Sequence, residues 1–151
     1  MEPALTLRTT RRAPDTRPAA ARLRILIADD QPEHLDMLAR ALERSAYGPR
    51  IELVRAEDGP SALALLDEAI DLAFFDIRMP GCSGLEAVAE MRKRPTVADT
   101  PVVIVSSSSD PRDVEHARRL GVTAYVEKGR YSLLRERIEA VLGHVLDGKP
   151  L

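Results

Sequence analysis

Short apolar runs alternate along the chain with longer segments whose apolar residues recur every three or four positions. Such short runs are typical of buried strands, and the periodic segments are typical of amphipathic helices. The alternation predicts five strands, each followed by a helix, and therefore an α/β protein with an open, doubly wound parallel sheet. The expected strands are residues 23–28, 51–56, 72–75, 101–105 and 124–126.

The spacing of apolar residues also indicates where the five helices lie. The clearest helix covers residues 59–70, because its apolar residues stand at i, i+3, i+4, i+7 and i+8. The first helix opens near Pro32 and should be broken at Gly48-Pro49, since glycine and proline disfavour helix interiors. The fourth, residues 111–120, has the least apolar surface, which fits either a mobile signalling face or a helix face in solvent.

Composition limits the classes of protein to which the chain can belong. Its 151 residues suit one domain, and 44% apolar with 30% charged residues is typical of a soluble globule. No apolar run approaches the length of a membrane span, and a net charge of −2 gives no general attraction to nucleic acid. The single cysteine, Cys82, excludes an intramolecular disulfide and a cysteine zinc cluster, and it fits the reducing cytoplasm.

The first 22 residues differ from the rest of the chain. They are rich in arginine, threonine and proline without a helical or strand period, so we expect a disordered basic tail at 1–22. One folded domain should follow at residues 23–146, with a short C-terminal tail at 147–151. The N-terminal tail lacks the apolar stretch of a secretory signal. It also has no aromatic residue for stacking on bases, which argues against specific nucleic-acid binding.

Polar residues of related chemistry follow four of the expected strands. Asp29 and Asp30 follow the first strand, Asp76 the third, Ser106 the fourth and Lys128 the fifth. Because the carboxyl ends of parallel strands meet at one edge of the sheet, these side chains should form one cluster. Three carboxylates repel one another, and Mg²⁺, which prefers oxygen ligands, would relieve that repulsion. A lysine and a hydroxyl suit phosphoryl oxygens, and a carboxylate can attack phosphorus, so the cluster predicts a Mg²⁺-dependent phosphoryl-acceptor site.

Each of these residues has a simpler interpretation when taken alone. An aspartate after a strand is commonly a helix cap or a turn residue, and a single serine or lysine is commonly an ordinary loop residue. Their joint occurrence at the strand ends of one sheet is what favours the phosphoryl-acceptor site. The three histidines, His34, His116 and His144, are scattered along the chain and are expected to face solvent.

Four segments resemble the bacterial response-regulator receiver domain in order, spacing and strand context. They are Ile27-Ala28-Asp29-Asp30, Phe74-Phe75-Asp76-Ile77-Arg78-Met79-Pro80-Gly81, Val103-Ile104-Val105-Ser106-Ser107 and Ala124-Tyr125-Val126-Glu127-Lys128. The resemblance covers residues 23 to about 146 and implies a flavodoxin-like receiver fold with strand order 2-1-3-4-5. Residues 106–114 further resemble stand-alone receivers that are paired with phytochrome-like histidine kinases.

The resemblance implies a role in a two-component phosphorelay. Asp76 would accept a phosphoryl group from a sensor histidine kinase, and Ser106 and Lys128 would contact its oxygens. Phosphorylation would draw the Ser106 hydroxyl inward and favour an inward rotamer of Tyr125, the switch residue. The implied Mg²⁺ ligands are Asp30, Asp76 and the backbone carbonyl of Arg78, with Asp29 acting through a metal-bound water.

The resemblance also shapes what we expect of the output. A receiver is a signalling module rather than an enzyme, although it assists its own phosphorylation and dephosphorylation. Only five residues follow Leu146, so we expect a stand-alone cytoplasmic receiver that signals by protein contact and has no membrane partner. A downstream protein, a histidine phosphotransfer protein and a homodimer all stay open as output partners.

Two positions depart from the family pattern. Gly129 follows Lys128 where the family usually has proline, so we expect a looser loop and a less firmly held lysine. Arg78 stands two residues after the acceptor, where a bulky cation would screen the attacking water and prolong the phosphoryl lifetime.

Three other functions fit parts of the sequence. A pseudo-receiver would keep the fold as an interaction module without phosphotransfer; the intact acidic set and Lys128 count against it, whereas Gly129 leaves it open. A haloacid-dehalogenase-like phosphatase needs a second aspartate two residues after the first, and that position is Arg78. A nucleotide-binding fold needs a glycine-rich loop after the first strand, and the sequence has none there.

Overall fold

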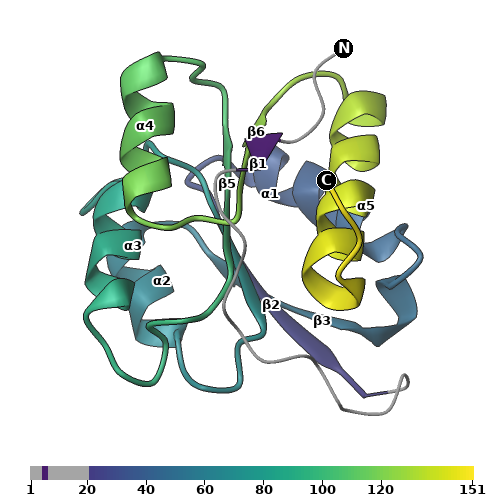
Figure 1. Ribbon diagram of the computed structural model, residues 1–151, viewed down its shortest axis with the longest axis horizontal. Coiled ribbons are helices and arrows are strands. Elements are labelled where there is room, and N and C mark those ends of the chain that lie inside the picture. Colours follow the sequence, from purple (N-terminus) through teal and green to yellow (C-terminus); the bar gives the residue numbers. More distant parts are fainter. Residues whose placement is uncertain (1–4, 7–20) are drawn as a thin grey trace.

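The computed structural model describes residues 5–6 and 21–151, which form one sheet flanked by helices (Figure 1). The strands are β1 (Leu5–Thr6), β2 (Leu23–Ala28), β3 (Ile51–Ala56), β4 (Leu72–Phe75), β5 (Val102–Ser106) and β6 (Ala124–Glu127). Their order across the sheet is β1-β6-β5-β4-β2-β3, and all neighbours from β6 to β3 are parallel. The predicted doubly wound α/β fold, with five parallel strands in the order 2-1-3-4-5, is confirmed.

Helices cover both faces of the sheet. They are α1 (Pro32–Glu43), α2 (Gly59–Leu65), α3 (Gly84–Arg92), α4 (Pro111–Arg119) and α5 (Tyr131–Asp147), with a short 3-10 helix, η1 (Gly48–Arg50), after α1. Helices α1 and α5 pack together on one face, and α2, α3 and α4 lie on the other (Figure 1). Because a helix crosses over between successive parallel strands, the carboxyl ends of β2, β4, β5 and β6 all lie at one edge of the sheet.

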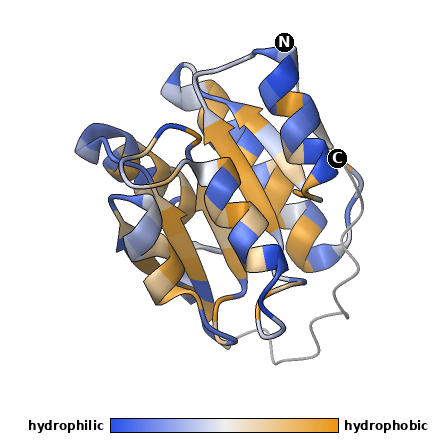
Figure 2. Ribbon diagram, turned by 90° about the vertical axis from the view of Figure 1, so that its left-hand side faces the viewer, coloured by the Kyte–Doolittle hydropathy of each residue, from blue (hydrophilic) through white to orange (hydrophobic). Residues whose placement is uncertain are grey.

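The two faces of the sheet bury separate hydrophobic clusters. Successive residues of a strand point to opposite faces, so Ile25 and Ile27 of β2 pack with α1 and α5, whereas Leu26 and Ala28 pack with α2 and α3. Figure 2 shows the strands as a hydrophobic layer between helices whose outward faces are hydrophilic. This double coverage explains why the strands are nearly continuous apolar runs in the sequence. Among the described residues, no helix combines the length and apolarity needed to cross a membrane.

Helix α2 is shorter than its apolar spacing predicts. It ends at Leu65 rather than at residue 70, because Leu66 has an extended backbone (φ −74°, ψ 125°). Leu66 and Ile70 are nevertheless buried in the same cluster as α2. The apolar spacing in residues 59–70 therefore reflects the burial of both the helix and the connection that follows it.

Helix α1 also ends before the predicted break at Gly48-Pro49. Its last residue is Glu43, and the Ser45 hydroxyl then donates a hydrogen bond to the carbonyl oxygen of Leu42 (2.7 Å). A local bond of this kind competes with continuation of the helical ladder. Glycine and proline instead begin η1, the single turn that leads into β3.

The sequence does not predict the sixth strand, β1. Leu5 and Thr6 pair with β6 in the antiparallel direction, with Leu5 opposite Tyr125. Two residues of the expected disordered tail thus form a strand, and residues 1–4 and 7–20 of that tail lie outside the described part of the chain. An unpaired edge of β6 would leave backbone N–H and C=O groups without hydrogen-bond partners. Pairing with β1 provides partners for some of these groups.

Gly84, the first residue of α3, lies against the backbone of Asp76. A Cβ at this position would be 1.9 Å from the Asp76 carbonyl oxygen, so Gly84→Ala must displace the loop after β4. We expect this variant to lower the free energy of unfolding in urea by about 1–3 kcal/mol, the usual range for overpacking. Gly129→Ala is the matched control, because no atom lies within 4 Å of its added Cβ. Equal losses in the two variants would contradict the prediction.

Candidate functional site

Three aspartates meet at the carboxyl ends of the neighbouring strands β2 and β4. Asp29 and Asp76 are buried, with 4% and 6% of their surface exposed, whereas Asp30 is exposed. One carboxylate oxygen from each lies within 4.8 Å of the other two. The backbone aligns the strand ends, since the Asp76 amide donates to the Ala28 carbonyl oxygen (2.9 Å). The structure thus brings together the three carboxylates that the strand ends predict.

Each buried carboxylate has one oxygen held by backbone and one held by an ammonium group. The amide of Gln31 donates to Asp29 Oδ1 (3.0 Å), and the amide of Ile77 donates to Asp76 Oδ1 (2.8 Å). Lys128 Nζ contacts the remaining oxygens, at 2.7 Å from Asp29 Oδ2 and 3.3 Å from Asp76 Oδ2. Both side chains are therefore fixed in orientation before any ligand binds.

The electrostatic environment of Asp76 disfavours its negative charge. Burial raises the pKa of this carboxyl above its ordinary value of 3.8, Lys128 opposes the rise, and the neighbouring Asp29 adds to it. One lysine thus compensates two buried carboxylates only in part, with Asp30 close by. A bound cation would complete the compensation, which makes the cluster a candidate metal site.

Several contacts hold Lys128 in place, although a flexible glycine follows it in the chain. It follows β6, its amide donates to the Ser106 carbonyl oxygen (2.7 Å), and only 9% of its side chain is exposed. Besides the two aspartates, its Nζ lies 2.8 Å from His34 Nδ1. The structure thus gives Lys128 three polar contacts, and His34, which was expected to face solvent, is partly buried with 28% of its side chain exposed.

Ser106 and Tyr125 are connected through Ser108, in the loop between β5 and α4. Ser106 is the buried last residue of β5, and its hydroxyl oxygen accepts a hydrogen bond from the Ser108 amide (3.1 Å). The hydroxyl of Tyr125, which is 4% exposed, donates to the Ser108 carbonyl oxygen (2.7 Å). Burial raises the pKa of this phenol. Tyr125 therefore already points inward in this structure.

The same serine joins the loop to α4. The Ser108 hydroxyl donates to Asp113 Oδ2 (2.6 Å), in the first turn of that helix. The hydroxyl oxygen also accepts a hydrogen bond from the Asp110 amide (3.2 Å), at the helix N-cap. A continuous chain of hydrogen bonds thus runs from the end of β5 to α4, the helix with the least apolar surface.

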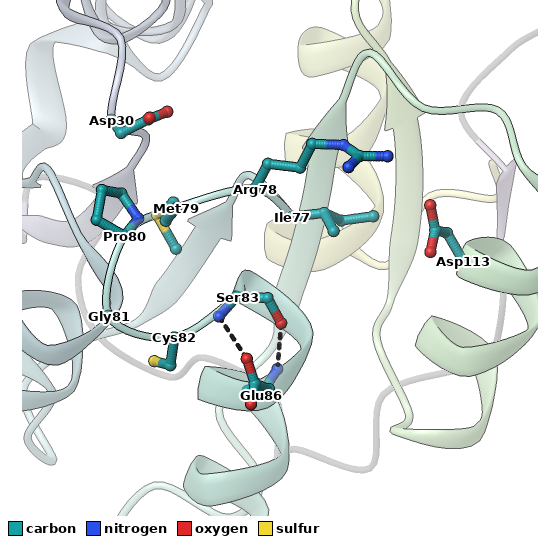
Figure 3. A pocket seen from close by; sticks show the side chains of 10 residues that line it. All are labelled: Asp30, Ile77, Arg78, Met79, Pro80, Gly81, Cys82, Ser83, Glu86 and Asp113. Atoms are coloured by element: carbon teal, nitrogen blue, oxygen red, sulfur yellow. Dashed lines mark hydrogen bonds between the residues drawn. The ribbon is translucent and has the colours of Figure 1, made fainter.

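An open pocket of about 560 Å³ lies beside the aspartates (Figure 3). Its lining includes Asp30, Arg78 and Asp113. Figure 3 shows Arg78 extending from the loop after β4 toward the side of the pocket where Asp113 lies. The floor is fixed by a capping box, in which Ser83 and Glu86 at the start of α3 each bind the other's backbone amide (3.1 and 2.8 Å). A guanidinium group thus lines the pocket on the side of Asp113.

Residues 25–139 match the family model of the response regulator receiver domain. The chain belongs to this family. Receiver domains are modules of two-component signalling. The family match rests on the sequence and not on the geometry of the site.

Relatives of this receiver domain differ greatly in length. Protein PilH of Pseudomonas aeruginosa is 32% identical over 106 residues, which cover 70% of this chain and 84% of PilH. The gliding motility regulatory protein of Myxococcus xanthus is 36% identical over 116 residues, covering 74% of this chain and 14% of that protein. The transcriptional regulatory protein YrkP of Bacillus subtilis is 34% identical over 105 residues, 42% of its length. The chain thus spans less than half of the last two relatives.

Solved structures share the fold over most of the chain. The phosphorylated cyanobacterial phytochrome response regulator RcpA has a TM-score of 0.75 and 26% identity, covering 87% of this chain and 99% of RcpA. The Mn²⁺-bound form of response regulator Rcp1 has a TM-score of 0.73 and 25% identity, covering 85% of this chain and 98% of Rcp1. The similarity of the receiver domain to both therefore extends beyond a local motif.

The roles of two residues at this site, Ser108 and His34, are not predicted by the sequence. Ser108 stands in the serine run 106–109, so its position was a signal, but the run does not reveal which serine joins the loop to α4. His34 gives no signal, because its partner Lys128 is 94 residues away in the chain. Both residues become visible only when the strand ends are assembled.

The raised pKa of Asp76 predicts how the stability of this receiver domain depends on pH. The native state binds this proton more tightly than the unfolded chain, so stability falls as pH rises from the ordinary carboxyl pKa through the raised one. Without divalent cations, Asp76→Asn should therefore raise the urea midpoint at about pH 7, and the gain should vanish at about pH 3, where both states are protonated. Asp67→Asn, at an exposed position, is the control. A gain that persists at the lower pH would contradict the prediction.

Proposed function

We propose that this chain is a response regulator that accepts a phosphoryl group on Asp76 from a sensor histidine kinase in a Mg²⁺-dependent reaction. The observation that carries the proposal is the buried Asp76 carboxylate, oriented by its backbone contact and by Lys128, beside two further carboxylates. Such a group is a preorganised nucleophile. The cytoplasm is the proposed location, because the phosphoryl donor acts there.

In the proposed transfer, an Asp76 oxygen forms a bond to phosphorus while the bond from phosphorus to the donor imidazole nitrogen breaks. The nitrogen keeps the electron pair. Lys128 Nζ lies 3.3 Å from Asp76 Oδ2, so it would be close enough to form an ion pair with a phosphoryl oxygen after the transfer. The hydroxyl of Ser106, at the end of the adjacent strand, would donate a hydrogen bond to a second phosphoryl oxygen.

The donor set fits Mg²⁺, whose preferred ligands are carboxylate, carbonyl and water oxygens. Asp30 and Asp76 would bind the ion directly, Asp29 through water, and the Arg78 carbonyl would complete the protein ligands. When bound, Mg²⁺ would offset the negative charge shared by the aspartates and the phosphoryl group. The closeness of the three carboxylates and the Mn²⁺-bound form of the similar regulator Rcp1 support this assignment.

The output step would use the hydrogen-bond chain through Ser108. Movement of the Ser106 hydroxyl toward a phosphoryl group would remove the acceptor of the Ser108 amide. The loop that holds both Tyr125 and Asp113 would then repack, which changes the face formed by α4, β6 and α5. A protein that distinguishes the two arrangements of this face would read the signal.

The similarity to RcpA, a cyanobacterial phytochrome response regulator, favours one class of donor. This chain covers 99% of RcpA, whereas it covers 14% of the gliding motility regulatory protein. We therefore assign a phytochrome-like histidine kinase as the phosphoryl source. The output partner, whether a downstream protein, a histidine phosphotransfer protein or a second copy of the chain, is not distinguished by these similarities.

Phosphorylation is tested by intact mass after incubation with acetyl phosphate and with a phosphorylated histidine kinase. We expect one added phosphoryl group that requires Mg²⁺ and is absent in Asp76→Asn. Asp67→Asn, an exposed aspartate away from the strand ends, should be phosphorylated like the wild type. Absence of added mass with either donor would instead identify a pseudo-receiver, an interaction module with this fold but without phosphotransfer.

Arg78 should control how long the phosphoryl group survives. Its side chain lines the same pocket as Asp30, and we propose that it screens the phosphoryl group from an attacking water. Arg78→Ala should therefore accelerate loss of the phosphoryl mass several-fold, whereas Arg78→Lys should change it less because a long cation is retained. Arg119→Ala, an exposed arginine of α4, is the control. Equal decay rates in the wild type and Arg78→Ala would refute this role.

A further inference from the structure

Lys128 makes three polar contacts, and one of them is not explained by the proposed phosphorelay chemistry. Its Nζ lies 2.7 Å from Asp29 Oδ2, 2.8 Å from His34 Nδ1 and 3.3 Å from Asp76 Oδ2. A lysine ammonium has three N–H donors and no acceptor, so these three acceptors match its full donor capacity. The two shortest contacts lie on the side of β2 and α1, and the longest is the one to the acceptor carboxylate.

The backbone near Lys128 gives little help in directing this side chain. Gly129 follows it, and a Cβ built at Gly129 would meet no atom within 4 Å. Lysine has a long flexible stem whose ordering costs rotamer entropy. The direction of the ammonium therefore depends on the groups that surround it rather than on packing of the following residue.

His34 is well placed to direct the ammonium. It is the third residue of α1, and its amide donates to the Gln31 carbonyl oxygen (3.0 Å) in the first turn. An imidazole that accepts at Nδ1 carries its proton on Nε2 and is uncharged. Asp29 and Asp76 would both exchange part of their contact with Lys128 for Mg²⁺ or a phosphoryl group, whereas His34 has neither role in the proposed chemistry.

We propose that His34 is a positioning residue, which accepts a hydrogen bond from Lys128 and keeps its ammonium directed at the oxygens on Asp76. This inference rests on the proposed function for its catalytic consequence. His34 touches no phosphoryl atom in this scheme and acts through Lys128. In this loop the residue after Lys128 is glycine, and the contact with His34 orients the lysine side chain.

The catalytic consequence is tested with beryllofluoride, a phosphoryl mimic, in the presence of Mg²⁺. His34→Leu keeps the bulk of the side chain but removes the acceptor, and it should lower the association constant about tenfold, as expected for loss of one hydrogen bond to a charged group. His34→Asn places an amide oxygen near the position of Nδ1 and should restore most of the affinity. The exposed His116→Leu in α4 should bind like the wild type.

A double-mutant cycle separates positioning from simple packing. In a Lys128→Met background, His34→Leu should cause no further loss of beryllofluoride affinity, because the residue through which His34 acts is gone. Equal losses in both backgrounds, or failure of His34→Asn to restore binding in a variant that melts like the wild type, would overturn the inference.

The contact is also tested without any ligand. The chain has three lysines, so ¹⁵N-lysine labelling gives at most three ammonium signals in NMR spectra, and Lys93 and Lys149 are exposed. We expect a slowly exchanging Lys128 signal that shifts or broadens in His34→Leu and is preserved in His116→Leu. A Lys128 signal unaffected by His34→Leu overturns the contact. If the wild type fails to bind beryllofluoride while this shift is seen, the proposed function fails and the positioning contact stands.

Discussion

Partial charge compensation between Lys128 and two buried aspartates is the interaction on which the site depends. Asp29 and Asp76 lie at adjacent strand ends, one lysine contacts both, and the pKa of Asp76 remains raised. Removing Lys128 would leave both buried carboxylates uncompensated, which is far more costly than losing a surface ion pair. The fold can hold this arrangement because the carboxyl ends of parallel strands lie together at one edge. The same incomplete compensation makes the cluster a candidate site for a cation.

The surrounding loops hold these charges in place by local hydrogen bonds. The amides of Gln31 and Ile77 fix one oxygen of each buried aspartate. The capping box of Ser83 and Glu86 fixes the start of α3, and Ser108 links the end of β5 to α4. Only the last of these links reaches α4, which buries little apolar surface, and the Tyr125 hydroxyl donates to the Ser108 carbonyl oxygen in the same loop. The site is thus connected to a helix at the surface by one chain of hydrogen bonds.

The departures of this chain from its family concern how the common groups are held. The receiver fold is shared with regulators such as RcpA over most of the chain. Gly129 removes a backbone constraint beside Lys128, and His34 lies where a side-chain contact can replace it. Arg78 adds a cation to the lining of the pocket. These three positions therefore change the groups around Lys128 and the pocket while the three aspartates are kept.

The sequence by itself determined the five parallel strands and the chemical groups at their ends. It could do so because buried strands are recorded as apolar runs and because strand ends are local positions. It did not determine the end of α2, since Leu66 and Ile70 are buried whether or not they are helical. Tertiary structure alone decided that β6 acquires β1 as a neighbour and that His34 meets Lys128 across 94 residues. Periodicity reports which residues are buried, whereas the partner of a polar group depends on how distant segments are brought together.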